Sequence, residues 1–509
     1  MLRILTPDEM YRCDSAAIAA GTPSRTLMTR ASAACADGVA VRLLSAQERP
    51  YVLVLCGTGN NGGDGICCAR LLRERGIPAD ICMASEPDPA IMSAECAYQY
   101  ETALAAGIPV LAGASGWRED YTCIVDALFG IGLSREPGGA YAALIDAANR
   151  YAEVHGIPVA SIDIPSGVNA LTGAVYEHAV RADLTFAISH IKRGHLLYPG
   201  ASYCGEMIAL DIGISDAPLA AAEGVPLYAP EDCDIKALLP ARVPDSNKGT
   251  YGRVLVIAGA KNMCGAAYLS AKAAYRTGAG LVEVFTCEEN RIPMQTLLPE
   301  AVLTTYQTQE EAVGNALSAA LGRADAVVLG PGLGQSETAL ALTRQVLTLS
   351  EKPTVIDADA LNLTAVHDLL PLLRARAEIP WILTPHPGEF SRLTGMSVSA
   401  LKTDFIGCAV SFAAEHGVIL NAKDSRSVIT DGRCAYLNIS GCSAMAKGGS
   451  GDVLTGITAA LAAQGCDPLC AAALGAFLHG RAGEAAAAKH GTRGMLAGEC
   501  ADALCEVIG

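Results

Sequence analysis

The chain has 509 residues, of which 51% are hydrophobic and 18% are charged, and its formal net charge is −16. At roughly 100–200 residues per domain, a chain of this length is expected to form two to four domains with a large core. The acidic balance and the absence of a long Lys/Arg run argue against nucleic acid and anionic membranes as main partners.

The N-terminal residues MLRILTPDEMYRCDSAAI contain no apolar run of the length of a signal peptide, and no stretch of about 18 apolar residues lacks charges. We therefore expect a cytoplasmic location and no membrane span. The 19 cysteines form no CxxC pair and no Cys/His cluster with zinc spacing. They are expected to be mainly reduced core residues.

Residues 8–48 have apolar positions at helical spacing, and residues 51–56 form a short apolar run typical of a buried parallel strand. The glycine-rich turn 57–65 follows, then a helix to about Arg75 and a second strand over 77–83, which contains Asp80. The turn contains the pattern GxGxxG between a strand and a helix, so an NAD-dependent Rossmann dehydrogenase is one interpretation. The crowding of polar side chains in the same turn favours a different site.

Acidic residues recur at the ends of later strands. The strand 121–126 ends in Asp126, and the strand 158–162 is followed by Asp163 and Ser166. The carboxyl ends of strands in an open α/β sheet lie at one edge, so one site would hold these three residues with Asn61 and Asp64. Carboxylate, amide and hydroxyl oxygens suit a hard cation and supply an acid/base group. Each residue alone would be read as a strand-end cap or a turn former.

The segments GTGNNGGDG, DALFGIGLSR and SIDIPSG closely resemble the N-terminal epimerase domain of the bifunctional NAD(P)H-hydrate repair enzymes, from about Leu5 to Gly213. The resemblance implies that Asp163 lies closest to the chemistry and that a potassium ion is bound by Asn61, Asp126 and Ser166. It also implies a set of substrate-binding residues, which are Asn60, Asn61, Gly62, Gly63, Asp64, Gly130, Ile131, Gly132, Leu133, Ser134, Arg135, Glu136, Tyr141 and Asp163.

Further strands are predicted over 181–189 and 205–213, with a loop over 191–195 between them that could contact phosphate. His195 is predicted to be a loop histidine and not a catalyst. Residues 215–232 are rich in Ala, Pro and Glu without a clear period, so they are predicted to link a first domain, 1–214, to a second, 233–509.

The second half repeats the alternation of strands and helices. Strands are predicted over 253–259, 281–285, 324–329, 353–356, 381–384 and 418–420, with a helix over 265–277 and a mainly helical end over 453–507. Polar or glycine-rich turns follow four of these strands, with the sequences GPGLG (330–334), DADALN (357–362), PHPGEF (385–390) and NAKDSRS (421–427).

The last turn, 446–456, contains four glycines and a serine, and all of them except Gly456 come before the apolar run Val453 to Leu461. Glycines and a helix start leave backbone N–H groups free to bind an anion, usually phosphate. Asp452 at this helix start is expected to stay ionised and to act as a base or to contact a substrate hydroxyl. An ordinary N-cap aspartate after a flexible loop is the alternative.

This turn resembles the anion hole of the ribokinase-like fold, and its longer form MAKGGSGDVLTG resembles the dehydratase domain of the same repair enzymes. That resemblance covers about Pro240 to Ile508. It implies that Ala267, Gly332, Gly334, His386 and Asp452 contact the hydrated nicotinamide nucleotide, with Asp452 catalytic. It implies nucleotide binding by Lys423, Asp424, Ser425, Arg426, Ser427, Gly448, Gly449, Ser450 and Gly451. Cys442 departs from the family, whose members often have Asn near this position.

We therefore predict an α/β chain with an N-terminal Rossmann-like parallel-sheet domain and a C-terminal ribokinase-like domain. The resemblance implies epimerisation of NADH hydrate and NADPH hydrate and their dehydration with ADP or ATP, together with magnesium. No nucleic-acid or membrane partner is expected. The chain is expected to form a homo-oligomer. A ribokinase-like small-molecule kinase with an accessory domain and a nucleotide-binding scaffold without catalysis are the alternatives. The sequence does not distinguish ADP from ATP, or one hydrated cofactor from the other.

Overall fold

The computed structural model describes residues 1–221, 224–307 and 312–509. These residues form two compact units, Arg3–Gly224 and Val225–Gly509, the second of which also takes in Met1–Leu2. The division at Gly224 falls within the predicted linker 215–232, of which residues 222–223 lie outside the described residues.

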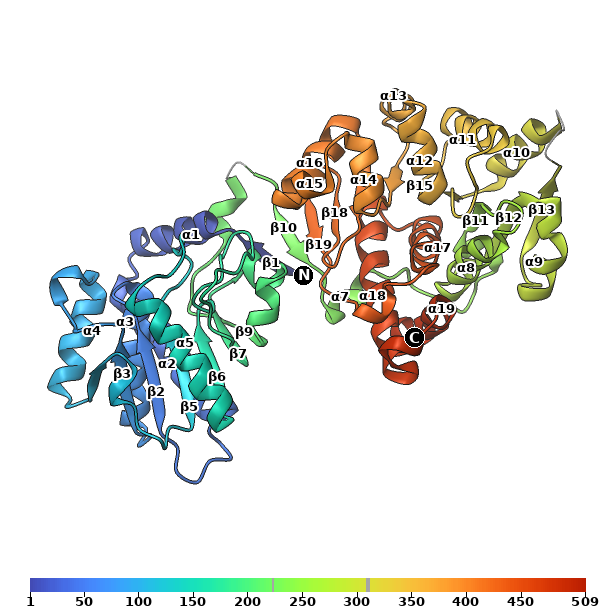
Figure 1. Cartoon of the computed structure of the whole chain (residues 1–509). Coiled ribbons are helices and arrows are strands. Elements are labelled where there is room, and N and C mark those ends of the chain that lie inside the picture. Colours follow the sequence, from blue (N-terminus) through green and yellow to red (C-terminus); the bar gives the residue numbers. More distant parts are fainter. Residues whose placement is uncertain (222–223, 308–311) are drawn as a thin grey trace. The chain divides into compact units, whose positions relative to one another are not determined.

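The first unit contains a seven-stranded parallel sheet in the order β4-β3-β2-β5-β6-β7-β9 (Figure 1). The chain enters at β2, runs outward to β4 and then returns to continue from β5, so the order reverses between β2 and β5. Ligands bind at such a reversal, outside the carboxyl ends of the strands. The sheet consists of β2 (Val52–Cys56), β3 (Ala79–Met83), β4 (Val110–Ala112), β5 (Cys123–Ala127), β6 (Val159–Ile162), β7 (Leu184–Ile188) and β9 (Glu206–Leu210), and the strands β1 (Leu2–Leu5) and β8 (Ile191–Lys192) lie outside it.

Helices cover both faces of this sheet because its central strands are apolar on both sides. In β2, Val52, Val54 and Cys56 pack with α2 and α3, whereas Leu53 and Leu55 pack against α5. The helices are α1 (Pro7–Ala19), α2 (Ser24–Arg42), α3 (Asn60–Glu74), α4 (Ala94–Ala105), α5 (Ala140–His155) and α6 (Arg193–Leu196).

Three strands of the first unit were not predicted. β4 has three residues, and β1 and β8 are a short parallel pair in which Ile4 lies opposite Ile191. Elements of this length are too short to show a hydrophobic period. The segment 191–195 was predicted to be a loop, and in the structure it consists of β8 and the start of α6.

The second unit contains a larger sheet whose strands run in the order β13-β12-β11-β14-β15-β16-β17-β18-β19-β10 (Figure 1). Neighbouring strands are parallel from β13 to β17, and β18 is antiparallel to both of its neighbours. The strands are β10 (Leu227–Ala229), β11 (Arg253–Ile257), β12 (Leu281–Cys287), β13 (Val302–Tyr306), β14 (Ala326–Leu329), β15 (Thr354–Ile356), β16 (Trp381–Leu383), β17 (Ile419–Ala422), β18 (Val428–Thr430) and β19 (Ala435–Leu437).

The helix that follows the last glycine-rich turn, α17, lies in the core of this unit. It packs against α8, β14 and β15, and every residue from Val453 to Ala462 is buried. The helices of the unit are α7 (Asp232–Leu238), α8 (Cys264–Arg276), α9 (Arg291–Leu297), α10 (Ala312–Arg323), α11 (Glu337–Leu349), α12 (Ala358–Val366), α13 (Leu370–Arg374), α14 (Pro387–Thr394), α15 (Val398–Thr403), α16 (Phe405–His416), α17 (Ser450–Ala463), α18 (Pro468–Gly494) and α19 (Ala497–Ile508).

Candidate active sites

A cavity of about 520 Å³ lies in the first unit, at the turns that follow β2, β5 and β6. We call it the first site. Most of the residues predicted to bind substrate line this cavity, namely Asn60, Asn61, Asp64, Gly130, Ile131, Gly132, Leu133, Ser134, Arg135, Tyr141 and Asp163. The exceptions are Gly62, Gly63 and Glu136. The Glu136 carboxylate accepts the backbone N–H groups of Glu177 and His178, so it closes a turn beside the site.

The glycines of the first turn serve close packing. A Cβ on Gly62 would lie 1.9 Å from the carbonyl oxygen of Gly57, and one on Gly63 would lie 2.8 Å from Met28 Cε. These contacts bring the start of α3 against the end of β2, and Asn61 then lines the cavity. The side-chain nitrogen of Asn61 is buried and has no hydrogen-bond partner among the described residues, which leaves it for a ligand.

Asp163 is held in an unusual backbone conformation directly after β6. Its φ is +71°, in the left-handed region, which is sparsely populated for residues other than glycine. The backbone N–H of Ile131 donates to Oδ2 of Asp163 at 3.2 Å, and Nζ of Lys192 donates to Oδ1 at 2.6 Å. Asp163 is 8% exposed, so the carboxylate is oriented by fixed donors at the wall of the cavity.

Lys192 and His195 support Asp163, and neither was predicted to do so. The Lys192 side chain is 1% exposed and also lines the cavity. One ring nitrogen of His195, Nδ1, accepts the backbone N–H of Lys192 at 2.9 Å, and the other, Nε2, lies 2.6 Å from the carbonyl oxygen of Asp163. Burial, followed by the charge of Lys192, lowers the pKa of His195 to about 4. The only sequence signal for this group was a lysine three residues before a histidine in a segment with no clear period.

Three carboxylates face the first site. Asp14 from α1 and Asp64 from α3 line the same cavity as Asp163. Burial raises the pKa of Asp64 well above its usual range, and the charges of Asp163 and Asp14 raise it further. A shift in this direction favours the protonated carboxyl, which can donate a hydrogen bond to a phosphate, whereas a carboxylate would repel one.

The Asp126 carboxylate is fully buried and makes four hydrogen bonds. The hydroxyl of Ser166 (2.7 Å) and the N–H of Leu128 (3.2 Å) donate to Oδ1, and the hydroxyl of Ser161 (2.9 Å) and the N–H of Ser166 (2.8 Å) donate to Oδ2. Its lone-pair sites are thus occupied, although burial still raises its pKa. The Ser166 hydroxyl also accepts the N–H of Phe129 at 2.9 Å, which leaves one oxygen lone pair on Ser166.

Asp80 does not occupy the position of the acidic residue in a dinucleotide-binding fold. It is the second residue of β3, away from the carboxyl end of that strand. Its two oxygens accept the hydroxyls of Tyr51 (3.0 Å) and Tyr121 (2.8 Å) inside the unit. Asp80 is therefore not the ribose-binding carboxylate expected of a Rossmann dehydrogenase.

Three strand-end segments and the start of one helix converge in the second unit, and we call this region the second site. Asp357 follows β15, Lys423 follows β17 and Gly451 lies in the first turn of α17. Nζ of Lys423 lies 2.8 Å from Oδ1 of Asp357, and a Cβ on Gly451 would be 3.3 Å from both partners. His386, after β16, is close enough for the Lys423 charge to lower its pKa, although burial contributes more.

Asp452 lies beside this ion pair. Burial is the main reason that its pKa rises to about 7, the charges of Asp357 and Asp359 add to the rise, and Lys423 opposes it. This differs from the expectation that Asp452 stays ionised because of its place at a helix start. Burial and the neighbouring carboxylate outweigh the helix dipole, which contributes only about 0.3–1 kcal/mol. A carboxyl with a pKa near neutrality suits a general base.

The remaining predicted substrate residues of the second site have mixed surroundings. Gly332 and Gly334 have φ values of +56° and +74°, and the N–H of Gly334 donates to Oδ2 of Asp359 at 2.8 Å. Ala267 is fully buried in the core, whereas the adjacent Ala266 is partly exposed. Nδ1 of His386 accepts the N–H of Gly388 at 3.0 Å, so the exposed Nε2 carries the proton of the neutral ring.

Glu389 is a buried carboxyl of the second site. It lies in the predicted turn 385–390, and no role was predicted for it. It is 4% exposed and accepts the backbone N–H of His386 at 2.8 Å. Burial raises its pKa to about 7. The sequence offered no means of separating this capping role from a catalytic one.

The turn after β17 is held by contacts within the protein. Asp424 accepts the N–H of Ser425 at 2.9 Å, Ser427 contacts Asp424, and Arg426 donates to the carbonyl of Ile439 at 3.0 Å. This ordering presents a preformed loop beside Lys423.

The glycines before α17 give the second site its helix start. Gly449 has a φ of +94° and is the N-cap of α17, so Ser450 and Gly451 lie in the first turn, where backbone N–H groups have no acceptor within the helix. The N–H of Ser450 donates to the carbonyl of Lys447 at 3.4 Å. The Ser450 hydroxyl donates to the carbonyl of Met445 at 2.8 Å. The Cys442 thiol contacts the carbonyl of Gly483 at 3.7 Å, so this side chain faces α18.

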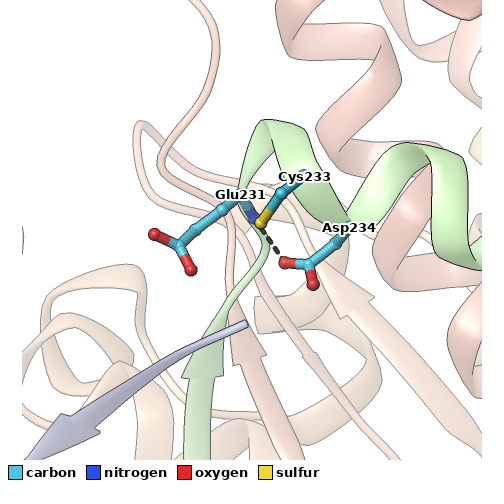
Figure 2. Close-up of side chains that lie close together, drawn as sticks. All are labelled: Glu231, Cys233 and Asp234. Atoms are coloured by element: carbon cyan, nitrogen blue, oxygen red, sulfur yellow. Dashed lines mark hydrogen bonds between the residues drawn. The ribbon is translucent and has the colours of Figure 1, made fainter.

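Among the described residues, one group has the composition and spacing of possible metal ligands. Figure 2 shows Glu231, Cys233 and Asp234 at the start of α7, with one ligand atom of each within 4.8 Å of the others. Glu231 and Cys233 are exposed, and Asp234 accepts the N–H of Glu231 at 2.8 Å. Acidic residues are common at helix starts because they complement the helix dipole, and this group needs no further explanation.

Comparison with known proteins was made for both units. A family model described as "NAD(P)H-hydrate dehydratase" matches residues 254–506, and one described as "YjeF-related protein N-terminus" matches residues 24–194. The bifunctional NAD(P)H-hydrate repair enzyme Nnr of Escherichia coli (strain K12) is 38% identical over 458 residues, covering 90% of this chain and 84% of that one. The protein of the same name from Coxiella burnetii is 37% identical, covering 94% of each chain.

This chain belongs to the family of bifunctional NAD(P)H-hydrate repair enzymes. The family assignment confirms the expected relationship and the two-domain α/β fold, Rossmann-like in the first unit and ribokinase-like in the second. Among solved structures, an ADP/ATP-dependent NAD(P)H-hydrate dehydratase from Bacillus subtilis, co-crystallised with ATP/Mg2+, is 32% identical. It covers 55% of this chain and 97% of that chain, with a TM-score of 0.48.

Among the residues that the structure describes, no helix has both the length and the apolar character needed to cross a bilayer.

Proposed function

We propose that the first unit interconverts the two epimers of hydrated NADH and NADPH, and that the second unit dehydrates one epimer with ADP. The observation that carries this proposal is the similarity to repair enzymes along both units, at 38% identity over 90% of the chain. The placement of one catalytic carboxylate in each site, Asp163 and Asp452, supports it. The proposed boundary between the two activities lies in the linker 215–232.

In the second site, the hydroxyl on the hydrated ring is a poor leaving group, and phosphorylation solves that problem. Asp452 takes the hydroxyl proton as the oxygen attacks the terminal phosphorus of the nucleotide, and the N–H groups of Gly448 to Gly451 stabilise the transferred charge. The bond from that phosphorus to its bridging oxygen breaks, and AMP leaves when the nucleotide is ADP. The ring C–O bond then breaks as phosphate leaves with the oxygen, and the adjacent ring carbon loses a proton to water, which restores the double bond. Lys423 and the loop to Ser427 hold the nucleotide, which enters as its magnesium complex.

In the first site, Asp163 assists while the C–O bond at the hydrated carbon opens and closes again. The start of α3, with Asn60, Asn61 and Asp64, binds the phosphates, because a helix start supplies N–H groups and the positive end of its dipole. Ile131 to Arg135 and Tyr141 surround the ring. Only one epimer suits a stereospecific dehydratase, so an epimerase in the same chain makes the repair complete.

A potassium ion is part of this proposal for the first site. Asn61, Asp126 and Ser166 offer amide, carboxylate and hydroxyl oxygens with one formal charge, a donor set that suits a large monovalent ion better than magnesium. The remaining lone pair of Ser166 fits such an ion. The unpartnered atom of Asn61 is its amide nitrogen, a donor that suits a substrate phosphate, so the Asn61 side-chain oxygen would be the ligand. Asp126, whose oxygens already accept four hydrogen bonds, would act mainly by adding its charge and holding Ser166. The ion would supply fixed positive charge for the phosphates or the ring.

The test uses the full chain and a mixture of both epimers of hydrated NADH. With ADP and magnesium, reduced nicotinamide should form from both epimers, until the hydrate is exhausted. A kinase with an accessory domain would consume nucleotide with other substrates and form no reduced nicotinamide, and a scaffold would do neither. Parallel reactions with ATP and with hydrated NADPH give the nucleotide and substrate preferences. A cytoplasmic location and a homo-oligomer stay predictions.

A further inference from the structure

We infer that Lys192 is a second catalytic residue of the first site, where it exchanges protons with the substrate together with Asp163, and that His195 is the residue that positions this pair. The inference rests on the proposed epimerase function and deepens it.

The Lys192 ammonium is the buried cation of the cavity wall. Two of its hydrogens are engaged, one by Oδ1 of Asp163 at 2.6 Å and one by the carbonyl of Ile188 at 2.7 Å. An ammonium has three hydrogens, so one remains for a ligand in the cavity that Lys192 lines. Burying a lysine to 1% exposure is costly even when it is paired. Packing alone does not require it, because an apolar side chain would fill the same space.

His195 cannot be the proton donor, but it fixes the two residues that are. Its Nδ1 accepts the N–H of Lys192, so Nε2 carries the hydrogen and donates to the carbonyl of Asp163 at 2.6 Å. The ring stays neutral because burial and the charge of Lys192 lower its pKa to about 4. One side chain therefore ties the backbone of β8 to the left-handed residue that carries the carboxylate.

The two oxygens of Asp163 face different groups. Oδ1 faces Lys192, while Oδ2 accepts the N–H of Ile131 and lies 3.0 Å from where a Cβ on Gly130 would be. The site thus has two separate places where a proton can enter or leave, Nζ of Lys192 and Oδ2 of Asp163. A direct hydrogen bond between the residues connects them.

This arrangement can complete an epimerisation with no net change in the protonation of Lys192 or Asp163. The C–O bond of the hydrated carbon breaks, its electron pair goes to the oxygen, and a proton from Lys192 releases that oxygen as water. The ring nitrogen lone pair forms a C=N bond, and the resulting cation lies beside the Asp163 carboxylate. Water then adds to the other face and gives its proton to Asp163. Transfer of that proton from Asp163 to Lys192 restores both groups, and the reverse reaction exchanges their roles.

The substitution Lys192→Arg provides the first test. Arginine keeps the charge and can keep the ion pair, but its pKa above about 12 prevents it from releasing a proton near neutral pH. We expect the epimerisation rate of the purified R epimer, corrected for the spontaneous rate, to fall about 10²–10⁴-fold. Dehydration of the S epimer by the second unit of the same molecules shows that the chain is intact. A variant that epimerises near the parent rate would overturn the inference, whereas a parent chain with no epimerase activity would overturn the proposed function instead.

Chemical rescue provides the second test, and it separates proton transfer from charge. In Lys192→Ala, added ethylammonium should restore epimerisation, and across a series of primary amines the rate should depend on the amine pKa. Guanidinium, with the same charge but no available proton, should not restore it. Equal rescue by both ions, or no rescue by any amine in a folded variant, would show that Lys192 only balances the charge of Asp163. His195→Gln, which can accept and donate hydrogen bonds at similar positions, should retain more activity than His195→Ala. Its pH profile should be the same as that of the parent chain.

Discussion

Nζ of Lys423 lies 2.8 Å from Oδ1 of Asp357, a carboxylate that is 2% exposed on its side chain. The cation assigned to the nucleotide phosphates is therefore already paired with a buried anion. Before a nucleotide binds, the pair holds the ends of β15 and β17 together, and its charges nearly cancel. A phosphate would share Lys423 with Asp357.

This pairing predicts an asymmetry between single and double substitutions. Lys423→Met leaves Asp357 buried without its partner, so we expect a loss of about 3–5 kcal/mol in the free energy of unfolding of the second unit. Lys423→Met combined with Asp357→Asn should recover most of it. Urea unfolding measures both. Lys402→Met is the control, since it breaks an exposed pair with Asp424 that is worth at most about 1 kcal/mol. Equal losses in the single and double variants would contradict the prediction.

The same lysine should affect nucleotide affinity. Lys423→Met removes a charge-assisted hydrogen bond to phosphate, so the dissociation constant for ADP should rise. Calorimetric titration of ADP into the variant and into Lys489→Met, which breaks an exposed pair with Glu506, measures the difference. An unchanged constant would mean that Lys423 serves only Asp357.

Asp452→Asn should remove dehydration and leave epimerisation intact. The asparagine amide cannot take the hydroxyl proton, and loss of a general base costs about 10²–10⁴ in rate. The epimerase reaction, followed by chromatography of the two epimers, is the internal control because it belongs to the other unit. Dehydration near the parent rate in this variant would exclude Asp452 as the base.

The pKa of Asp452 also sets a pH dependence. A base must be deprotonated, so dehydration should rise with pH through about 7, the value to which burial and Asp357 raise the pKa. Asp357→Asn removes a negative neighbour and frees the Lys423 charge, and both changes favour the ionised form. The rise should therefore move to lower pH. Glu389→Gln tests the other carboxyl with a pKa of about 7, and it should leave the rise in place. If the rise in dehydration with pH shifts or disappears in Glu389→Gln, Glu389 and not Asp452 is the base.

Much of both sites could be predicted because parallel strands place their carboxyl ends together. The predicted strands that end in Asp126 or come just before Asp163, His386 and Lys423 were each short, apolar and followed by a polar turn, which is the pattern of a buried strand. Adjacency along one sheet edge then follows from the fold class without any knowledge of contacts.

The contacts that were not predicted depend on long-range geometry. β8 has two residues, and the Lys192 in it reaches Asp163 across 29 positions of the chain. The pKa of Asp452 depends on its burial at the start of α17 and on Asp357, which lies far away in the sequence. Predicting it from a helix start alone overlooked the cost of burying charge.

Two glycines of the first turn offer a matched pair of substitutions. A Cβ on Gly62 would lie 1.9 Å from the Gly57 carbonyl oxygen, whereas a Cβ on Gly59 would meet nothing within 4 Å. Gly62→Ala should lower the thermal stability of the first unit and its epimerase rate, because backbone must move; overpacking of this kind costs about 1–3 kcal/mol. Gly59→Ala should leave stability nearly unchanged. Similar melting curves for the two variants would mean that the turn is more adaptable than its packing indicates.

The last prediction concerns the proposed potassium site. Asp126 is fully buried and receives donors from Ser161, Ser166 and Leu128. In Asp126→Asn, the amide group would face at least one of these donors, so both the charge and the orientation of Ser166 would be disturbed. We expect a lower epimerase rate and no response to potassium. The rate is measured against potassium chloride, with choline chloride holding the ionic strength constant.

Ser161→Ala tests whether Asp126 serves a potassium site or only caps the end of its strand. It removes one donor to Asp126 but touches none of the proposed ligands, Asn61, Asp126 and Ser166, so the potassium response should persist. Ser166→Ala removes the lone pair left for the ion, and it should abolish the response with a smaller loss of stability than Asp126→Asn, because a fully buried carboxyl with four hydrogen bonds is the costlier group to disturb. If Ser161→Ala and Ser166→Ala lose activity in proportion to stability and both keep the response, Asp126 is a strand-end cap and the ion binds elsewhere.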